Sequence, residues 1–142
     1  MYRNILVPVD LDEPSSWEQA LPAARAFSTA FGARLTLVTV IPDIRLMLDV
    51  QWSPIGFDEM VDIARARLGS LADAIEGVGE VARHVETGAI YAGILAVSER
   101  IGADLIVLAS HRPAMKDYLL GTNAARVVRH ARCSVLVVRD RA

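Results

Sequence analysis

The residues best placed for chemistry follow an apolar run in the last third of the chain. Residues 103–108 are apolar apart from one aspartate, which is typical of a buried parallel strand. Ser110 comes soon after this run, and Gly121-Thr122-Asn123 opens an amphipathic helical pattern further on. Free N–H groups at the start of such a helix attract an anion. This pattern predicts a nucleotide site, although an ordinary helix N-cap at Thr122 explains the same residues equally well.

A second polar position, Asp10, closes the first apolar run at residues 5–9. Its carboxylate could accept hydrogen bonds from a ribose hydroxyl or an adenine amine, or it could cap the following turn together with Asp12. His111 could orient a ribose or phosphate, and Arg112 could pair with phosphate oxygens or simply be a solvated charge. No Ser or Cys at nucleophile-elbow spacing accompanies His111, so the sequence predicts no catalytic residue.

The other side chains that could do chemistry favour structural interpretations. His84 falls in a predicted strand and His130 at a predicted helix end, where structural histidines are common. Cys133 is the only cysteine, which excludes an internal disulfide, disfavours a thiolate metal site and fits a reducing compartment. We expect it to behave as a small hydrophobic residue. No metal site is predicted.

Apolar runs of strand length alternate with helical patterns along the chain. The strands are predicted at 5–9, 35–41, 81–86, 105–109 and 135–138, and the helices at 15–31, 57–77, 90–101 and 123–131. Connections of this length make neighbouring strands parallel, with right-handed crossovers. We therefore expect an α/β fold: an open, doubly wound, five-stranded parallel sheet of order 3-2-1-4-5 with helices on both faces. Such a sheet binds ligands where strand order reverses, here between strands one and four.

Two details of these elements are open to structural test. The first helix is expected to begin with a capping box of Ser15 and Glu18, to kink at Pro22 and to stop at Gly32. The connection at 42–56 is unusually long and apolar. It could pack on its own domain or on a partner subunit, or it could form a lid over a ligand.

Length and composition exclude several classes of protein. A chain of 142 residues is expected to form one domain, 1–142, with a sizeable core. A formal charge of -2 with scattered arginines gives no attraction for nucleic acid. The first apolar run is too short to be a signal sequence or a membrane span, so we expect a cytoplasmic protein. No P-loop or dinucleotide-binding glycine motif is present, and Thr87 and Asp140 stand where a receiver domain needs aspartate and lysine.

Several segments together resemble the universal stress protein family, especially its small single-domain F/G branch. These segments are ILVPVD at 5–10, VTVIP at 38–42, ASHRP at 109–113, YLLGTNAA at 118–125 and CSVLVVR at 133–139. The resemblance implies the fold expected above, a cytoplasmic role in surviving stress, and a homodimer through the last strand. A continuous apolar edge strand from Val135 to Val138 would itself need covering.

The resemblance also implies a ligand, ATP or AMP, with or without Mg²⁺. Carried over by position, its site would comprise Pro8, Val9, Asp10, Val40, Leu108, Ala109, Ser110, His111, Arg112, Gly121, Thr122 and Asn123. ATP-binding members carry G-x2-G-x9-G-[ST], and Ala109 and Arg112 here replace the first two glycines, with one residue fewer before Gly121. Their side chains could crowd the ribose and phosphates, since glycine allows close backbone approach.

Three hypotheses follow. The first is a dimeric stress sensor or switch that binds adenine nucleotide with at most slow hydrolysis or self-phosphorylation. The second is a nucleotide-free dimeric scaffold, which the two replaced glycines favour and the retained Gly121-Thr122-Asn123 disfavours. The third is an enzyme acting on an adenylated substrate, which would need a catalytic group that the sequence does not reveal.

Overall fold

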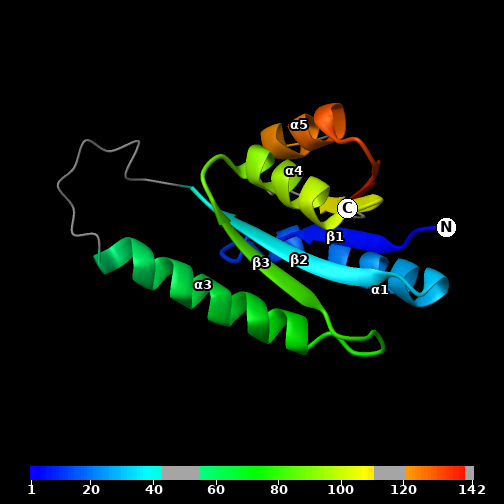
Figure 1. Ribbon diagram of the computed structural model, residues 1–142, viewed down its shortest axis with the longest axis horizontal. Coiled ribbons are helices and arrows are strands. Elements are labelled where there is room, and N and C mark those ends of the chain that lie inside the picture. The colour runs from blue at the N-terminus through cyan, green and yellow to red at the C-terminus, as the bar shows by residue number, and fades with distance from the viewer. Residues whose placement is uncertain (43–54, 111–120, 140–142) are drawn as a thin grey trace.

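The computed structural model describes residues 1–42, 55–110 and 121–139 (Figure 1). Five parallel strands form a sheet of order β3-β2-β1-β4-β5, as predicted. The strands are β1 (Asn4–Pro8), β2 (Arg34–Ile41), β3 (Ala82–Thr87), β4 (Leu105–Ala109) and β5 (Ser134–Val138). Each strand overlaps the apolar run that predicted it, so the periodicity located all the strands to within about a residue at each end.

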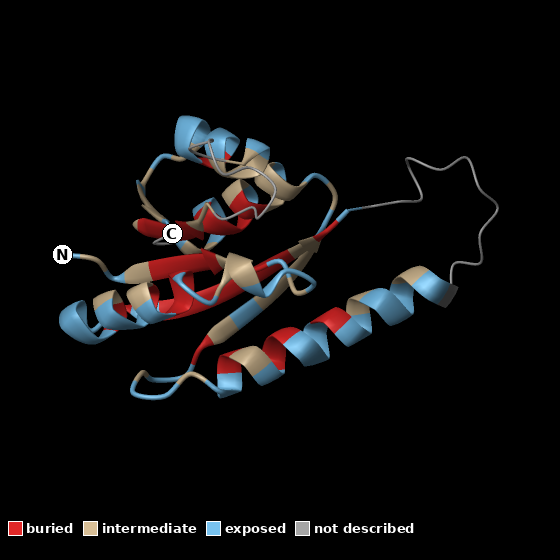
Figure 2. Cartoon of the chain, turned by 180° about the vertical axis from the view of Figure 1, so that it is seen from behind, coloured by how far each residue is buried: buried red, intermediate tan, exposed pale blue. Residues whose placement is uncertain are grey.

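Helices cover both faces of the sheet (Figure 1). They are α1 (Ala20–Phe31), α3 (Ile55–Asp73), α4 (Ile90–Ile101) and α5 (Thr122–His130), with a short 3₁₀ turn at Pro14–Ser16. The core under α1 and α3 is separate from the core under α4 and α5, and Figure 2 shows the buried side of each helix turned toward the sheet. In the part of the chain that the structure describes, no helix combines the length and apolarity needed to cross a membrane.

The central strand β1 shows why its sequence is continuously apolar. Ile5 and Val7 pack in the core beneath α1 and α3, whereas Leu6 packs in the core beneath α4 and α5. All three side chains are fully buried. A strand buried on both faces has no polar alternation, which is the pattern expected of a parallel sheet covered by helices.

The beginning of the first helix differs from the prediction. Pro14–Ser16 forms a 3₁₀ turn, and α1 begins only at Ala20 without a side-chain cap. The capping box of Ser15 and Glu18 is therefore wrong. Pro22 falls in the first turn of α1, where its missing N–H costs no hydrogen bond within the helix. The physical reason for a kink is absent at that position.

Glycines end two of the helices. Gly32 follows α1 with φ 65° and Gly102 follows α4 with φ 67°, a left-handed conformation that only glycine adopts without strain. The predicted stop of the first helix at Gly32 is confirmed. Helix α3 ends at Asp73, before the predicted end at Gly77, because the chain turns there.

The long apolar connection is only partly described. Ile55 and Gly56 belong to the first turn of α3, so the helix begins earlier than its predicted start at residue 57. Residues 43–54 lie outside the described part of the chain. The alternatives for this connection, packing or lid, stay predictions.

Candidate functional site

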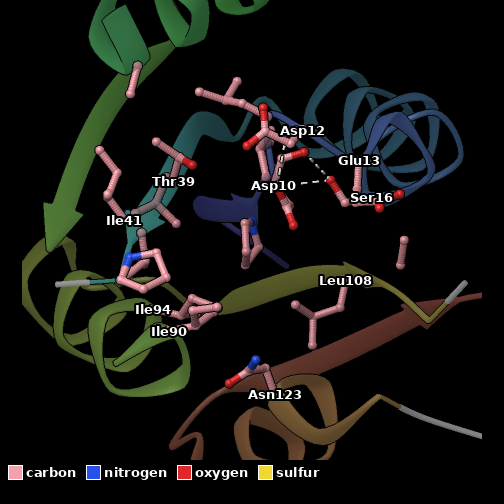
Figure 3. Close-up of a pocket in the computed structure, with 18 of the residues that line it drawn as sticks. Asp10, Asp12, Glu13, Ser16, Thr39, Ile41, Ile90, Ile94, Leu108 and Asn123 are labelled. Carbon is pink, nitrogen blue, oxygen red and sulfur yellow. Dashed lines mark hydrogen bonds between the residues drawn. The ribbon is translucent and has the colours of Figure 1, made fainter. Parts of the chain in front are cut away.

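A cleft of about 940 Å³ opens at the carboxyl ends of the strands (Figure 3). Its lining comes from the ends of β1, β2 and β4, from the loop after β1, and from α3, α4 and the beginning of α5. Strand order reverses between β1 and β4, so the loops after these two strands lead to opposite faces and leave a crevice. The cleft therefore lies where the sequence predicted a ligand site.

The loop after β1 is held in shape around Asp10. The Asp10 N–H donates to Ser16 Oγ at 2.9 Å, and the Ser16 hydroxyl donates back to the Asp10 carbonyl oxygen at 3.1 Å. The Asp12 N–H donates to Asp10 Oδ1 at 3.1 Å, so the predicted turn-capping role is confirmed (Figure 3). Among the described residues nothing donates to Asp10 Oδ2. That oxygen can accept a ligand hydrogen bond while Oδ1 keeps the turn.

Arg67 fixes the same loop from α3. Its Nη1 donates to Asp12 Oδ1 at 3.0 Å and its Nη2 donates to the Leu11 carbonyl oxygen at 2.6 Å. Arg67 also lines the cleft. Arg67 thus balances the negative charge of Asp12 at the mouth of the cleft and joins α3 to the loop that carries Asp10.

The opposite wall of the cleft is apolar. Val40 at the end of β2, Leu108 in β4, and Ile90 and Ile94 on α4 contribute to it. Ile94 is 4% exposed and Leu108 is 5% exposed, so this wall continues directly into the core beneath α4 and α5. Such a surface suits the flat face of a ring and offers it no hydrogen bonds.

The beginning of α5 closes the cleft from the far side. Gly121 is the N-cap residue with extended backbone, and among the described residues no side chain caps the helix. The expectation that Thr122 caps it is wrong: Thr122 is already in the first turn and is exposed. Asn123 is half-buried and lines the cleft (Figure 3). The first N–H groups of α5 have no partner within the helix, and together with the positive end of the helix dipole they favour an anion.

The structure gathers most of the predicted site residues. Those that line the cleft are Pro8, Val9, Asp10, Val40, Leu108, Ala109, Ser110, Gly121 and Asn123. Thr122 adjoins the cleft without being part of its lining. His111 and Arg112 lie outside the described residues. Their contacts with a ligand remain predictions.

Sequence reasoning missed the contributions of α3 and α4. Met60, Ile63 and Arg67 line the cleft from α3, and Met60 and Ile63 are 43% and 57% exposed. Ile90 and Ile94 line the cleft from α4, and nothing in their helical pattern marks them as site residues. Helical periodicity separates a buried face from a solvated one, but it carries no sign that one end of that face borders a cleft.

Glu13 also lines the cleft, whereas Cys133 and His130 are not among its lining residues. Burial raises the pKa of the Cys133 thiol, an effect that its contact with the Ser98 hydroxyl partly opposes. The His130 ring lies 6.4 Å from the Tyr91 ring, centroid to centroid. Within the described ranges no three His, Cys, Asp or Glu side chains are grouped so that they could hold a metal ion.

Comparison with known proteins agrees with this fold. The model of the Universal stress protein family matches residues 1–139. Universal stress protein G of Escherichia coli O157:H7 is 31% identical, over 98% of this chain and 100% of that protein. A solved universal stress family protein from Burkholderia pseudomallei is 29% identical, with a TM-score of 0.62 and 96% of each chain covered. A universal stress protein solved in complex with cAMP has a TM-score of 0.61 at 22% identity, covering 97% of each chain. This chain belongs to the universal stress protein family.

Proposed function

We propose that the protein binds an adenine nucleotide, ATP or AMP, in the cleft between β1 and β4. One observation carries the proposal: a carboxylate oxygen with no donor among the described residues, an apolar wall and the N-terminus of α5 line the same cleft. These match in turn the polar edges of ribose and adenine, the face of the base and the phosphates. The cAMP complex of a protein with the same fold supports the ligand class.

Each part of the nucleotide has a partner in this arrangement. Asp10 Oδ2 would accept from a ribose hydroxyl or the adenine amine, with Pro8 and Val9 beside it. Val40 and Leu108 would contact the base. The phosphates would meet the N–H groups that begin α5, together with Gly121, Thr122 and Asn123, and with His111 and Arg112 beyond β4. Mg²⁺, where it takes part, would accompany a triphosphate and screen its charge from the carboxylates at the mouth.

We further propose that the protein acts in the cytoplasm as a homodimeric stress sensor or switch. Among the described strands, β5 lies at the edge of the sheet and pairs with β4 alone. Its four apolar residues, 135–138, are each only partly buried in the isolated chain. A second copy of the same edge would cover them and satisfy the unpaired backbone groups.

A second candidate, a nucleotide-free dimeric scaffold, is favoured by one residue. Ala109 lines the cleft at the end of β4, at the position where the glycine motif of ATP-binding family members has its first glycine. Its methyl group occupies space that a ribose or phosphate could otherwise approach. The scaffold would keep the β5 interface and lose the ligand.

A titration followed by NMR tests the proposal. The uniformly ¹⁵N-labelled protein, freed of carried-over nucleotide, is titrated with ATP, AMP and GTP, each with and without Mg²⁺. We expect ATP or AMP to shift the amide signals of Asp10, Val40, Ala109 and Gly121, and GTP to leave them in place. Shifts by none of the nucleotides would contradict nucleotide binding and support the scaffold. Sedimentation as a monomer would contradict the dimer independently.

A further inference from the structure

Gly93 lies in the interior of α4, where its lack of a side chain permits an unusually close contact. A Cβ atom at Gly93 would lie 2.9 Å and 3.0 Å from the two γ carbons of Val40 and 3.5 Å from its Cβ. Real Cβ atoms essentially never approach other atoms below 3.0 Å. The backbone of α4 can therefore rest against Val40 only because residue 93 is glycine.

Val40 has no easy way to make room. It is β-branched, so its χ1 angle has few favourable values, and both of its methyl groups face Gly93. A rotation of χ1 by one staggered step moves one methyl group away and leaves the other against Gly93. The displaced methyl group then has to find space on a residue that lines the cleft. If the helix moved instead, α4 would carry Ile90 and Ile94, which line the same cleft, away from the sheet.

We propose that Gly93 is a positioning residue that keeps the cleft open for a flat purine base. It does so by giving the methyl groups of Val40 a place beneath α4 rather than in the cleft. Gly93 itself does not line the cleft, so it acts only through Val40 and the position of α4. The ligand part of this inference rests on the proposed function, whereas the steric part does not.

A second glycine provides a matched control. Gly69 is a buried interior residue of α3, and a Cβ atom there would lie 2.7 Å from Arg83 Nη1. That atom ends a long flexible side chain, which can move aside. Neither Gly69 nor Arg83 lines the cleft. Gly69→Ala thus makes the same chemical change in a helix without touching the proposed site.

The test measures AMP and ATP affinity by calorimetry, with urea unfolding as a check of stability. The variants are Gly93→Ala, Val40→Ala, the double variant Gly93→Ala/Val40→Ala, and Gly69→Ala. We expect Gly93→Ala to weaken binding about tenfold or more, as overpacking of a fitted site does, and Gly69→Ala to leave it within about twofold. The double variant should regain the affinity of Val40→Ala, because the smaller side chain relieves the contact.

The outcomes separate this inference from the proposed function. Wild-type protein that binds no adenine nucleotide contradicts the proposed function and the ligand part of the inference with it. Wild-type binding with unchanged affinity in folded Gly93→Ala overturns the inference alone. If Gly93→Ala does not fold, the double variant must fold and bind; a double variant that also unfolds, or stays weak, overturns it. A crystal structure of unliganded Gly93→Ala should show either the Val40 methyl groups in the cleft or α4 displaced. A structure that shows neither change would contradict the steric part of the inference.

Discussion

The two walls of the cleft are built by different physical means. The wall after β1 is exposed and polar, and its shape depends on hydrogen bonds among Asp10, Asp12, Ser16 and Arg67. The wall of α4 and β4 is apolar and continues into the core through Ile94. The first wall can recognise polar groups and contributes little to folding. The second wall gives the cleft its shape and contributes much of the stability beneath it.

The largest effect that this comparison predicts concerns the stability of the apolar wall. Ile94→Ala removes most of a side chain that is 4% exposed and leaves a cavity beneath α4. We expect the free energy of unfolding, measured in urea, to fall by about 2–5 kcal/mol. Ile94→Val, which removes one methylene, should cost about 0.5–1.5 kcal/mol. A loss below 0.5 kcal/mol, roughly the lower limit for deleting one buried methylene, would show that the wall is not part of the core.

In the polar wall, a substitution should weaken nucleotide binding more than it lowers the stability of the protein. Asp10→Ala deletes the carboxylate proposed to bind the ribose or adenine, so nucleotide affinity should fall by about 1.5–3 kcal/mol, roughly 10- to 150-fold. The free energy of unfolding of the Asp10→Ala variant should fall by only about 1 kcal/mol, because one exposed hydrogen bond of the turn, from the Asp12 N–H, is lost. Asp10→Asn keeps an acceptor for that turn bond and is the control. Unchanged affinity in Asp10→Ala would remove Asp10 from the site.

A smaller effect is expected at the junction of α3 with the polar wall. Arg67→Gln breaks two contacts, the ion pair with Asp12 and the hydrogen bond to the Leu11 carbonyl oxygen. The side chains of Arg67 and Asp12 are 47% and 87% exposed. Solvent and salt screen such a pair, so unfolding should change by no more than about 1 kcal/mol. Affinity should fall about threefold in low salt as the loop loosens, and less in 0.5 M salt, where the Debye length is only several ångströms. Equal losses at both salt concentrations would argue against an electrostatic role.

The smallest effect is expected in the reactivity of Cys133, which lies outside both walls of the cleft and serves as a control. Burial raises the pKa of the Cys133 thiol, so at a given pH the folded protein carries less thiolate than the unfolded chain. Alkylation by iodoacetamide at pH 8 should therefore be slower in native protein than in urea, and should accelerate only at higher pH. Nucleotide should leave this rate unchanged. A strong effect of ATP on the rate would show that the ligand moves the region around α5 and β5.

The sequence predicted the sheet well because its information is local and repeated. Each strand is an apolar run between helical patterns, and the crossover length makes the strands parallel. Helix boundaries were harder. Ser15, the predicted cap, lies in a 3₁₀ turn ahead of the helix. Its neighbour Ser16 bonds to Asp10, a contact that becomes visible only when the loop is folded.

The site was predicted where it depends on strand ends and missed where it depends on helix faces. Asp10, Ala109 and Gly121 stand at ends of elements, and topology places such ends together. Arg67 and Gly93 act from helix interiors, and their partners are set by packing between elements distant in the sequence. Single-sequence periodicity holds no information on that packing.

Calorimetric titration of the nucleotide-free protein with ATP and AMP, with GTP as the competitor base and with Mg²⁺ present or absent, tests the central claim most directly. The account predicts saturable binding of an adenine nucleotide that GTP does not reproduce, and loss of that binding in Asp10→Ala. A flat titration with every nucleotide, from protein shown to be folded, would contradict the claim and leave the dimeric scaffold as the function of this fold.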